Sequence, residues 1–183
     1  MDGNARWAQA RELPVLAGHR EGAKALKRTV RHAVKHAVEE LTVYAFSTEN
    51  WSRPRDEVDG LMAMFAELIE SETPELDEEG VRMVFIGRRD EVSDALREKM
   101  SWAEERTREN ERMKLFVAFN YGGRAEIVEA AERYDGGGEE EFAKLLYAPD
   151  MGDPDVLWPD FSREDLEAAL ETYGSRTRRF GGR

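Results

Sequence analysis

Residues 44 to 54 read Tyr-Ala-Phe-Ser-Thr-Glu-Asn-Trp-Ser-Arg-Pro, and this is the most informative stretch of the sequence. It overlaps an apolar run, Leu41 to Phe46, which predicts a β-strand that is too continuously apolar to be half exposed. The run ends abruptly in polar and aromatic side chains that are able to bond a ligand. Because ligands of open α/β sheets bind beyond the carboxyl ends of the strands, the stretch predicts a buried strand that leads into a binding site.

Apolar residues at helical and strand spacing continue on both sides of this stretch. The spacing predicts helices over 20–39, 58–69, 90–109 and 125–133, and the second of these is expected to end before Pro74. A short helix is predicted to end at Tyr147, and a last helix to begin at Ser162, which caps it. The spacing also predicts strands over 82–86 and 114–119. This alternation is typical of one α/β domain, here residues 1–183, with a mostly parallel central sheet flanked by helices. Because three strands make a thin sheet, we expect strands of the complete sheet to be missing from this sequence.

The composition is that of a globular protein, and it excludes several classes. The 183 residues are 40% hydrophobic and 36% charged, with a net charge of −12 and no cysteine. We therefore expect no disulfide, no thiolate metal site and no nucleic-acid partner, and we expect a cytoplasmic setting. The sequence contains no apolar run long enough to span a membrane and no recognisable secretory signal.

Two short segments near the beginning contain groups that suit a phosphate. Residues 1 to 7 read Met-Asp-Gly-Asn-Ala-Arg-Trp, in which Arg6 can bind a phosphate and Asp2 can bind Mg²⁺. Residues 18 to 22 read Gly-His-Arg-Glu-Gly, and His19 is predicted to open a helix, where an imidazole can meet an anion. Each segment also fits a structural role, as a turn in the first case and as a capping or core histidine in the second.

The loop after the predicted strand is richer in such groups. Ser47, Thr48 and Asn50 can donate or accept hydrogen bonds, Glu49 can accept them, and Arg53 can hold a phosphate. The structural alternative is a strand-to-helix connection that is held by a satisfied asparagine. The sequence contains neither a Walker loop nor a Gly-x-Gly-x-x-Gly motif, so the common nucleotide-binding motifs do not account for these groups.

Taken together, the segments resemble the cis-prenyltransferase family, whose best-known members are the undecaprenyl diphosphate synthases. The matching motifs are Met-Asp-Gly-Asn-x-Arg-Trp-Ala at 1–8, Ala-Gly-His-Arg-x-Gly at 17–22, Leu-Thr-x-Tyr-Ala-Phe-Ser-Thr-Glu-Asn-Trp-x-Arg-Pro at 41–54, Asn-Tyr-Gly-Gly-Arg-x-Glu-Ile-Val at 120–128, Val-Leu-Trp-Pro-Asp-Phe at 156–161 and Arg-Arg-Phe-Gly-Gly at 178–182. The resemblance implies a hydrophobic tunnel between sheet and helices. It also implies a Mg²⁺-dependent prenyltransferase, which condenses isopentenyl diphosphate with an allylic prenyl diphosphate and so lengthens a polyprenyl diphosphate with cis double bonds.

The resemblance assigns roles to individual residues. Asp2 matches the catalytic aspartate that handles Mg²⁺ and the leaving diphosphate. Asn50 matches a residue with a part in proton removal from isopentenyl diphosphate, and its helpers match Ser47, Thr48 and Glu49. The positions that bind the allylic diphosphate match Gly3, Asn4, Ala5, Arg6, Trp7 and His19, and further substrate-binding positions match Trp51 and Arg53.

The tunnel and the assembly are further expectations from the resemblance. Candidates for the tunnel wall are Val58, Leu61, Met62, Phe65 and the strand residues Val43 to Ala45, although an ordinary core helix and strand would have the same residues. The family implies a homodimer in the cytoplasm that works at the membrane surface by peripheral contact. Its C-terminal tail reaches the partner subunit's site, and the matching residues here are Arg179, Gly181 and Gly182.

This sequence departs from the family pattern in several places. Val15 stands where the family usually has an arginine for the diphosphate, and Ala5 replaces a glycine or arginine. The family has an additional segment between Asp155 and Val156, which carries arginines, a serine and a glutamate for the second substrate and Mg²⁺. A strand before Met1 and part of the helix after Arg133 are also absent.

Two explanations are open: a true loss of these pieces, or a sequence that joins segments of a longer chain. If the loss is real, the alternative function is a catalytically degenerate homologue, acting as an accessory subunit or an isoprenoid-binding module.

Overall fold

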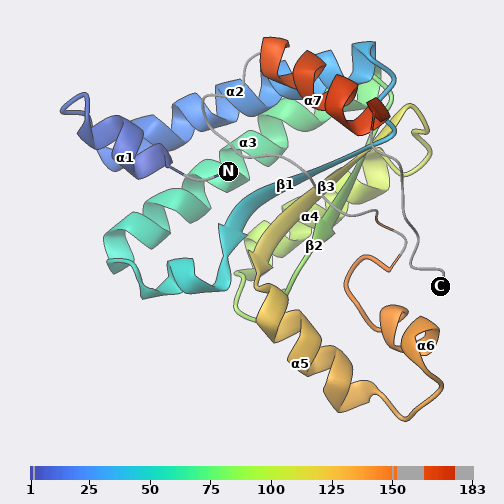
Figure 1. The fold of residues 1–183 in the computed structure, drawn as a ribbon. Helices are drawn as coiled ribbons and strands as arrows, with labels where there is room; N and C mark the ends of the chain where they lie inside the picture. Colours follow the sequence, from blue (N-terminus) through green and yellow to red (C-terminus); the bar gives the residue numbers. More distant parts are fainter. Residues whose placement is uncertain (2, 150, 152–162, 176–183) are drawn as a thin grey trace.

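The computed structural model describes residues 1, 3–149, 151 and 163–175, and its centre is a parallel three-stranded sheet (Figure 1). The strands are β1 (Glu40–Ser47), β2 (Val81–Ile86) and β3 (Met113–Tyr121), and they lie in the order β1-β3-β2. Both neighbouring pairs are parallel. The predicted fold class, a mostly parallel sheet flanked by helices, is therefore confirmed.

The central strand, β3, is buried on both faces. On one face, Leu115, Val117 and Phe119 pack in the main core with α2 (Val15–Lys35), α3 (Arg55–Glu78) and α4 (Asp94–Arg106). On the other face, Phe116 and Ala118 pack in a smaller cluster that includes part of the segment 147–151. Because successive strand residues point to opposite faces, a strand with both faces covered is expected to be apolar, as β3 is from Leu115 to Phe119.

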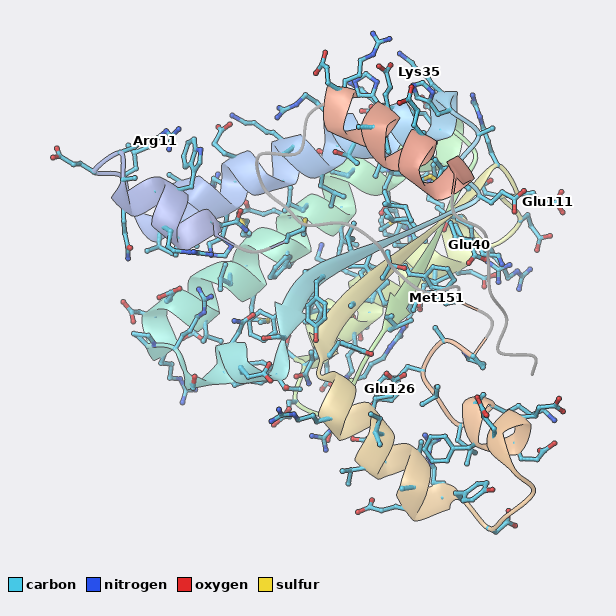
Figure 2. The ribbon with its side chains drawn as sticks, viewed as in Figure 1. Arg11, Lys35, Glu40, Glu111, Glu126 and Met151 are labelled. Atoms are coloured by element: carbon cyan, nitrogen blue, oxygen red, sulfur yellow. The ribbon has the colours of Figure 1, made fainter. Side chains whose placement is uncertain are left out.

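The remaining helices lie at the periphery (Figure 1). The short helix α1 (Asn4–Gln9) packs against the start of α2, and α5 (Gly123–Arg133) and α6 (Glu139–Ala143) follow the carboxyl end of β3. Helix α7 (Arg163–Ser175) contacts α2 near Lys35 (Figure 2). The predicted cap Ser162 lies outside the described residues. Within the described ranges, no helix is long and apolar enough to cross a membrane.

The outer edge of β2 is closed by side chains of α4 and the turn that follows it. The Met83 amide donates to Thr107 Oγ1 at 2.9 Å, and the Phe85 amide donates to Glu104 Oε1 at 2.8 Å. Asn110 Nδ2 donates to the Val81 carbonyl at 3.1 Å. These bonds satisfy backbone groups that would otherwise be open to another strand.

The burial of β1 differs from the expectation. Val43 and Phe46 are buried, but Tyr44 is 39% exposed, so the strand is half exposed after all. The reason is its position, because β1 lies at the other edge of the described sheet. The Met1 amino group donates to the Tyr44 carbonyl at 3.0 Å on this strand.

Two helix boundaries also differ from the expectation. Helix α2 begins at Val15, directly after Pro14, and ends at Lys35, so His19 lies in its second turn instead of opening the helix. Helix α3 continues through Pro74. A proline inside a helix removes one backbone hydrogen bond, and here core packing on either side of it, by Thr73 and Leu76, keeps the chain helical.

Candidate active site

The first two motifs meet where α1 packs against α2, and two glycines make this contact possible. A Cβ atom on Gly18 would lie 2.0 Å from the Asn4 carbonyl oxygen, and one on Gly22 would lie 2.6 Å from Asn4 Oδ1. Real Cβ atoms essentially never approach this closely. The two glycines lie one helical turn apart on the same face of α2. Because neither has a side chain, Asn4 packs directly against α2 and its side chain is buried.

Asn4 and His19 form a buried polar pair with unused hydrogen-bonding capacity. Asn4 Nδ2 lies 3.4 Å from His19 Nδ1. In the described part of the chain, Asn4 Oδ1 and His19 Nε2 are buried and have no hydrogen-bond partner. Buried polar atoms without a partner are uncommon and costly, so these two atoms mark a place where a ligand would bond.

The environment of His19 keeps its imidazole neutral. Burial lowers the pKa of His19, the positive charge of Arg53 lowers it further, and Glu57 opposes the shift. If Nδ1 accepts from Asn4 Nδ2, the ring proton must be on Nε2, which is then a buried donor that faces no acceptor. Such a donor suits a phosphate oxygen. The effect of Arg53 on His19 also shows that the third motif lies near the second.

The third motif forms a tight 3₁₀ turn, η1 (Thr48–Ser52), at the carboxyl end of β1. Ser47 and Asn50 cap it reciprocally: the Ser47 amide donates to Asn50 Oδ1 at 2.9 Å, and the Ser47 side chain accepts from the Asn50 amide. Thr48 Oγ1 lies 3.4 Å from Glu49 Oε2. Hydrogen bonds from its own amide and from the Ser47 hydroxyl lower the pKa of Glu49. Asn50 therefore has a structural role, because it caps the turn that connects β1 to α3.

Trp51 and Arg53 are held by partners outside η1. The Trp51 ring packs edge-on against Phe46, with centroids 5.0 Å apart, and its indole nitrogen donates to Asn120 Oδ1 at 2.7 Å. Arg53 Nη1 pairs with Glu57 Oε1 at 2.5 Å, and Glu57 lies in the first turn of α3. The sequence reasoning assigned no role to Asn120 or Glu57. An acid four residues after Arg53 is a signal that would have found Glu57.

An apolar cavity of about 110 Å³ lies between the sheet, α2 and α3. Its wall is apolar along most of its length and includes Val30, Ala45, Met64, Phe65, Leu68, Ile69, Leu76, Met83, Phe85, Leu115, Val117 and Phe119. Asn4 and His19 also line it, so the unpartnered polar atoms adjoin an apolar space. Lys27 and Glu72, which pair at 2.7 Å, line it between the two helices.

The predicted tunnel wall is correct for two residues only. Phe65 and Ala45 line the cavity, whereas Val43, Val58 and Leu61 are buried in the core and Met62 packs against it. The difference is one of position along α3, because residues one helical turn apart share a face and the cavity lies beside the later turns of the same stripe. The α3 residues that line it are Met64, Phe65, Leu68, Ile69, Glu72 and Leu76.

Some predicted site residues are peripheral or lie outside the description. Gly3 is the N-cap of α1, Ala5 is half-buried and Arg6 is exposed. The Trp7 ring is covered by the Arg11 guanidinium, 4.2 Å from the ring centroid. Asp2, the predicted catalytic and metal-binding residue, lies outside the described residues, as do the junction of Asp155 with Val156 and the tail residues Arg179, Gly181 and Gly182.

The comparisons with known proteins agree with this arrangement. The family model described as putative undecaprenyl diphosphate synthase matches residues 1–157. An isoprenyl transferase of Fusobacterium nucleatum is 40% identical over 215 residues, covering 100% of this chain and 93% of the relative. A ditrans,polycis-undecaprenyl-diphosphate synthase of Micrococcus luteus, described as specific for (2E,6E)-farnesyl diphosphate, is 37% identical over 221 residues, covering 100% and 89%. Both alignments are longer than this chain, so both relatives contain residues that it lacks.

A solved structure gives the same result in three dimensions. Lavandulyl diphosphate synthase from Lavandula x intermedia, in complex with dimethylallyl diphosphate, superposes with a TM-score of 0.86 at 28% identity. The superposition covers 100% of this chain and 95% of that structure. The chain therefore belongs to the undecaprenyl diphosphate synthase family of isoprenyl transferases, and it is a prenyltransferase by fold and by sequence.

Proposed function

We propose that this protein condenses isopentenyl diphosphate with an allylic prenyl diphosphate, forming a cis double bond in each cycle and releasing a polyprenyl diphosphate. The observation that carries the proposal is the cavity, which is apolar along most of its wall and adjoins an unpartnered buried donor, His19 Nε2. A prenyl diphosphate combines the same two properties, because its chain is apolar and its head group accepts hydrogen bonds. The names of two relatives, one specific for farnesyl diphosphate and one solved with dimethylallyl diphosphate, support the same substrate class.

The allylic substrate is proposed to bind with its diphosphate at Asn4 and His19. His19 Nε2 donates to a phosphate oxygen, which gives this buried donor the partner it lacks. The Asn4 amide contributes a second contact, and Gly3, Ala5, Arg6 and Trp7 form the surrounding loop and helix start. The prenyl chain then runs into the cavity along Phe65 and Leu68.

Mg²⁺ fits this arrangement as a companion of the diphosphate. Within the described residues, no group of three or more acidic or histidine side chains is placed to hold a metal. Mg²⁺ is commonly held by one or two carboxylates together with substrate phosphates, and the unpartnered His19 Nε2 donor fits such a phosphate. We propose Asp2 as the protein ligand. When bound, the ion would neutralise negative charge on the leaving diphosphate.

Isopentenyl diphosphate is proposed to bind at η1. The reaction breaks the allylic C–O bond, joins the allylic carbon to isopentenyl diphosphate, and removes one proton from the latter. Arg53 supplies positive charge for the second diphosphate, and Ser47, Thr48, Glu49 and Trp51 line the approach. Asn50 takes part by fixing the geometry around proton removal, because its Oδ1 already accepts the Ser47 amide.

We further propose that the protein works as a homodimer at the membrane surface of the cytoplasm, where its product is used. The test of the activity is incorporation of labelled isopentenyl diphosphate by the purified protein, with farnesyl diphosphate and Mg²⁺. Incorporation that is lost with a chelator and restored by Mg²⁺ supports the proposal. Binding of prenyl diphosphate without any incorporation would identify a degenerate accessory subunit instead.

A further inference from the structure

Asn120 lies at an irregularity in the sheet, at the end of β3. Register between β1 and β3 pairs Phe46 with Phe119 and then Ser47 with Tyr121, so Asn120 is passed over. Its φ is 50°, in the left-handed region that asparagine tolerates better than most residues, and it is fully buried. Bulges of this kind redirect a side chain out of the ladder, and they occur often beside active sites.

The Asn120 side chain connects two loops that are distant in the sequence. Its Oδ1 accepts the Trp51 indole N–H at 2.7 Å. Its Nδ2 donates to the Arg88 carbonyl at 3.2 Å and to Glu91 Oε2 at 3.1 Å, both in the connection from β2 to α4. The orientation of the amide follows from these partners, because an indole only donates, whereas a carbonyl and a carboxylate accept.

The same segment supports η1 at a second point. A Cβ atom on Gly122 would lie 2.5 Å from Thr48 Oγ1, so the backbone two residues after Asn120 packs directly against the beginning of η1. Trp51 is further fixed by the edge-on ring of Phe46, which stacks on Phe119 with centroids 5.4 Å apart. The turn is therefore held at Thr48 by Gly122 and at Trp51 by Asn120.

We infer that Asn120 is a positioning residue for the isopentenyl diphosphate site, acting through Trp51. This inference rests on the proposed function, since η1 is the site proposed for that substrate. The hydrogen bond from Trp51 to Asn120 fixes the position of η1, which contains Asn50 and is followed by Arg53. Without it, a partly buried indole donor loses its acceptor, and we expect the turn to shift to satisfy it.

Two substitutions separate this role from a general structural one. Asn120→Asp keeps an oxygen for the Trp51 indole but places a carboxylate against Glu91 and the Arg88 carbonyl. Asn120→Ala removes both sets of bonds. If Asn120 acts through Trp51, Asn120→Ala lowers kcat/KM for isopentenyl diphosphate by about 5- to 150-fold, the range for leaving one buried donor unpaired. Asn120→Asp then stays within about threefold of the wild type in kcat/KM but is less stable. Adding Glu91→Gln restores part of that stability, because a glutamine amide can donate to the new carboxylate.

A double-mutant cycle with Trp51→Phe tests the route of the effect, because phenylalanine keeps an aromatic ring and removes the donor. Asn120→Ala is expected to add less than a twofold loss in the Trp51→Phe background. Losses that multiply would overturn the inference, as would an equal loss of affinity for the allylic diphosphate. Thr107→Val is the matched control, since Thr107 is also fully buried and hydrogen-bonds β2 away from the site; it should lower stability and leave kcat/KM unchanged.

A measurement without substrate tests the Trp51–Asn120 hydrogen bond independently of the proposed function. In protein labelled with ¹⁵N-tryptophan, the indole resonance that disappears in Trp51→Phe belongs to Trp51. This resonance should shift markedly in Asn120→Ala and little in Thr107→Val. An unmoved resonance in Asn120→Ala would contradict the hydrogen bond itself, whereas a wild-type protein that incorporates no isopentenyl diphosphate would refute the proposed function and leave this result standing.

Discussion

Replacing Gly22 by alanine tests the packing that buries Asn4 beside His19. The new Cβ would lie 2.6 Å from Asn4 Oδ1, which is the end of a side chain, so the expected response is that the Asn4 side chain swings away from α2. Inside a helix, alanine is more favourable than glycine by about 1 kcal/mol. This gain offsets the loss of the weak Asn4–His19 contact, so the free energy of unfolding should change by no more than about 1 kcal/mol.

The effect on binding should be larger than the effect on stability. A hydrogen bond to a charged group contributes about 1.5–3 kcal/mol, so losing the Asn4 contact to the diphosphate should weaken allylic diphosphate binding by roughly 10- to 150-fold. Isothermal titration calorimetry with a non-reacting prenyl thiodiphosphate measures the affinity, and urea denaturation measures the stability.

Gly60→Ala is the matched control, because Gly60 is also inside a helix and a Cβ there meets only the flexible Leu16 side chain, at 3.0 Å. It should gain up to about 1 kcal/mol of stability and bind the allylic substrate normally. The reasoning fails if Gly22→Ala behaves like Gly60→Ala in both measurements, since Asn4 would then not depend on close contact with α2.

Three further outcomes follow from the same geometry. Gly18→Ala should destabilise the protein far more than Gly22→Ala in urea denaturation, because its Cβ would meet backbone, 2.0 Å from the Asn4 carbonyl oxygen; equal stabilities would contradict the α1–α2 packing. Burial lowers the pKa of His19, so below about pH 6.5 the unfolded chain binds the proton that the folded chain excludes, and the free energy of unfolding should fall as pH decreases from 7.5 to 5.5. The fall should be smaller in His19→Gln, and an identical pH slope would refute a neutral, buried imidazole. Lys27→Met should change the free energy of unfolding by less than about 1 kcal/mol, because the ion pairs of Lys27 are partly exposed, and a much larger loss would show that they are a principal support of the α2–α3 contact.

The strands were predictable from the sequence because their apolar runs are short and bounded by polar residues. Val81–Ile86 and Met113–Tyr121 agree with the predicted strands to within two residues at each end. Strand burial was less predictable, since Leu41 to Phe46 is as apolar as a central strand and yet lies at an edge of the described sheet. Pro74 was misleading for a related reason, because Thr73 and Leu76 on either side of it pack into the core and so stabilise a turn that the local sequence disfavours.

The candidate site divides in the same way. The motifs singled out three segments, and the structure brings Asn4, His19 and Arg53 of those segments together. Which apolar residues line the cavity depends on where along α3 the cavity lies, and the stripe from Val58 to Phe65 does not encode that position. The role of Asn120 depends on a bulge between paired strands, and a bulge is a property of register that no local pattern reports.

The most direct test of the central claim compares the wild type with Asp2→Ala in one assay. Each protein receives an allylic diphosphate, labelled isopentenyl diphosphate and Mg²⁺, and the products are separated by chain length and examined for double-bond geometry. We expect the wild type to form labelled polyprenyl diphosphates with new cis double bonds, and a folded Asp2→Ala protein to form no labelled product. Absence of incorporation by the wild type, or undiminished turnover by Asp2→Ala, would contradict the central claim.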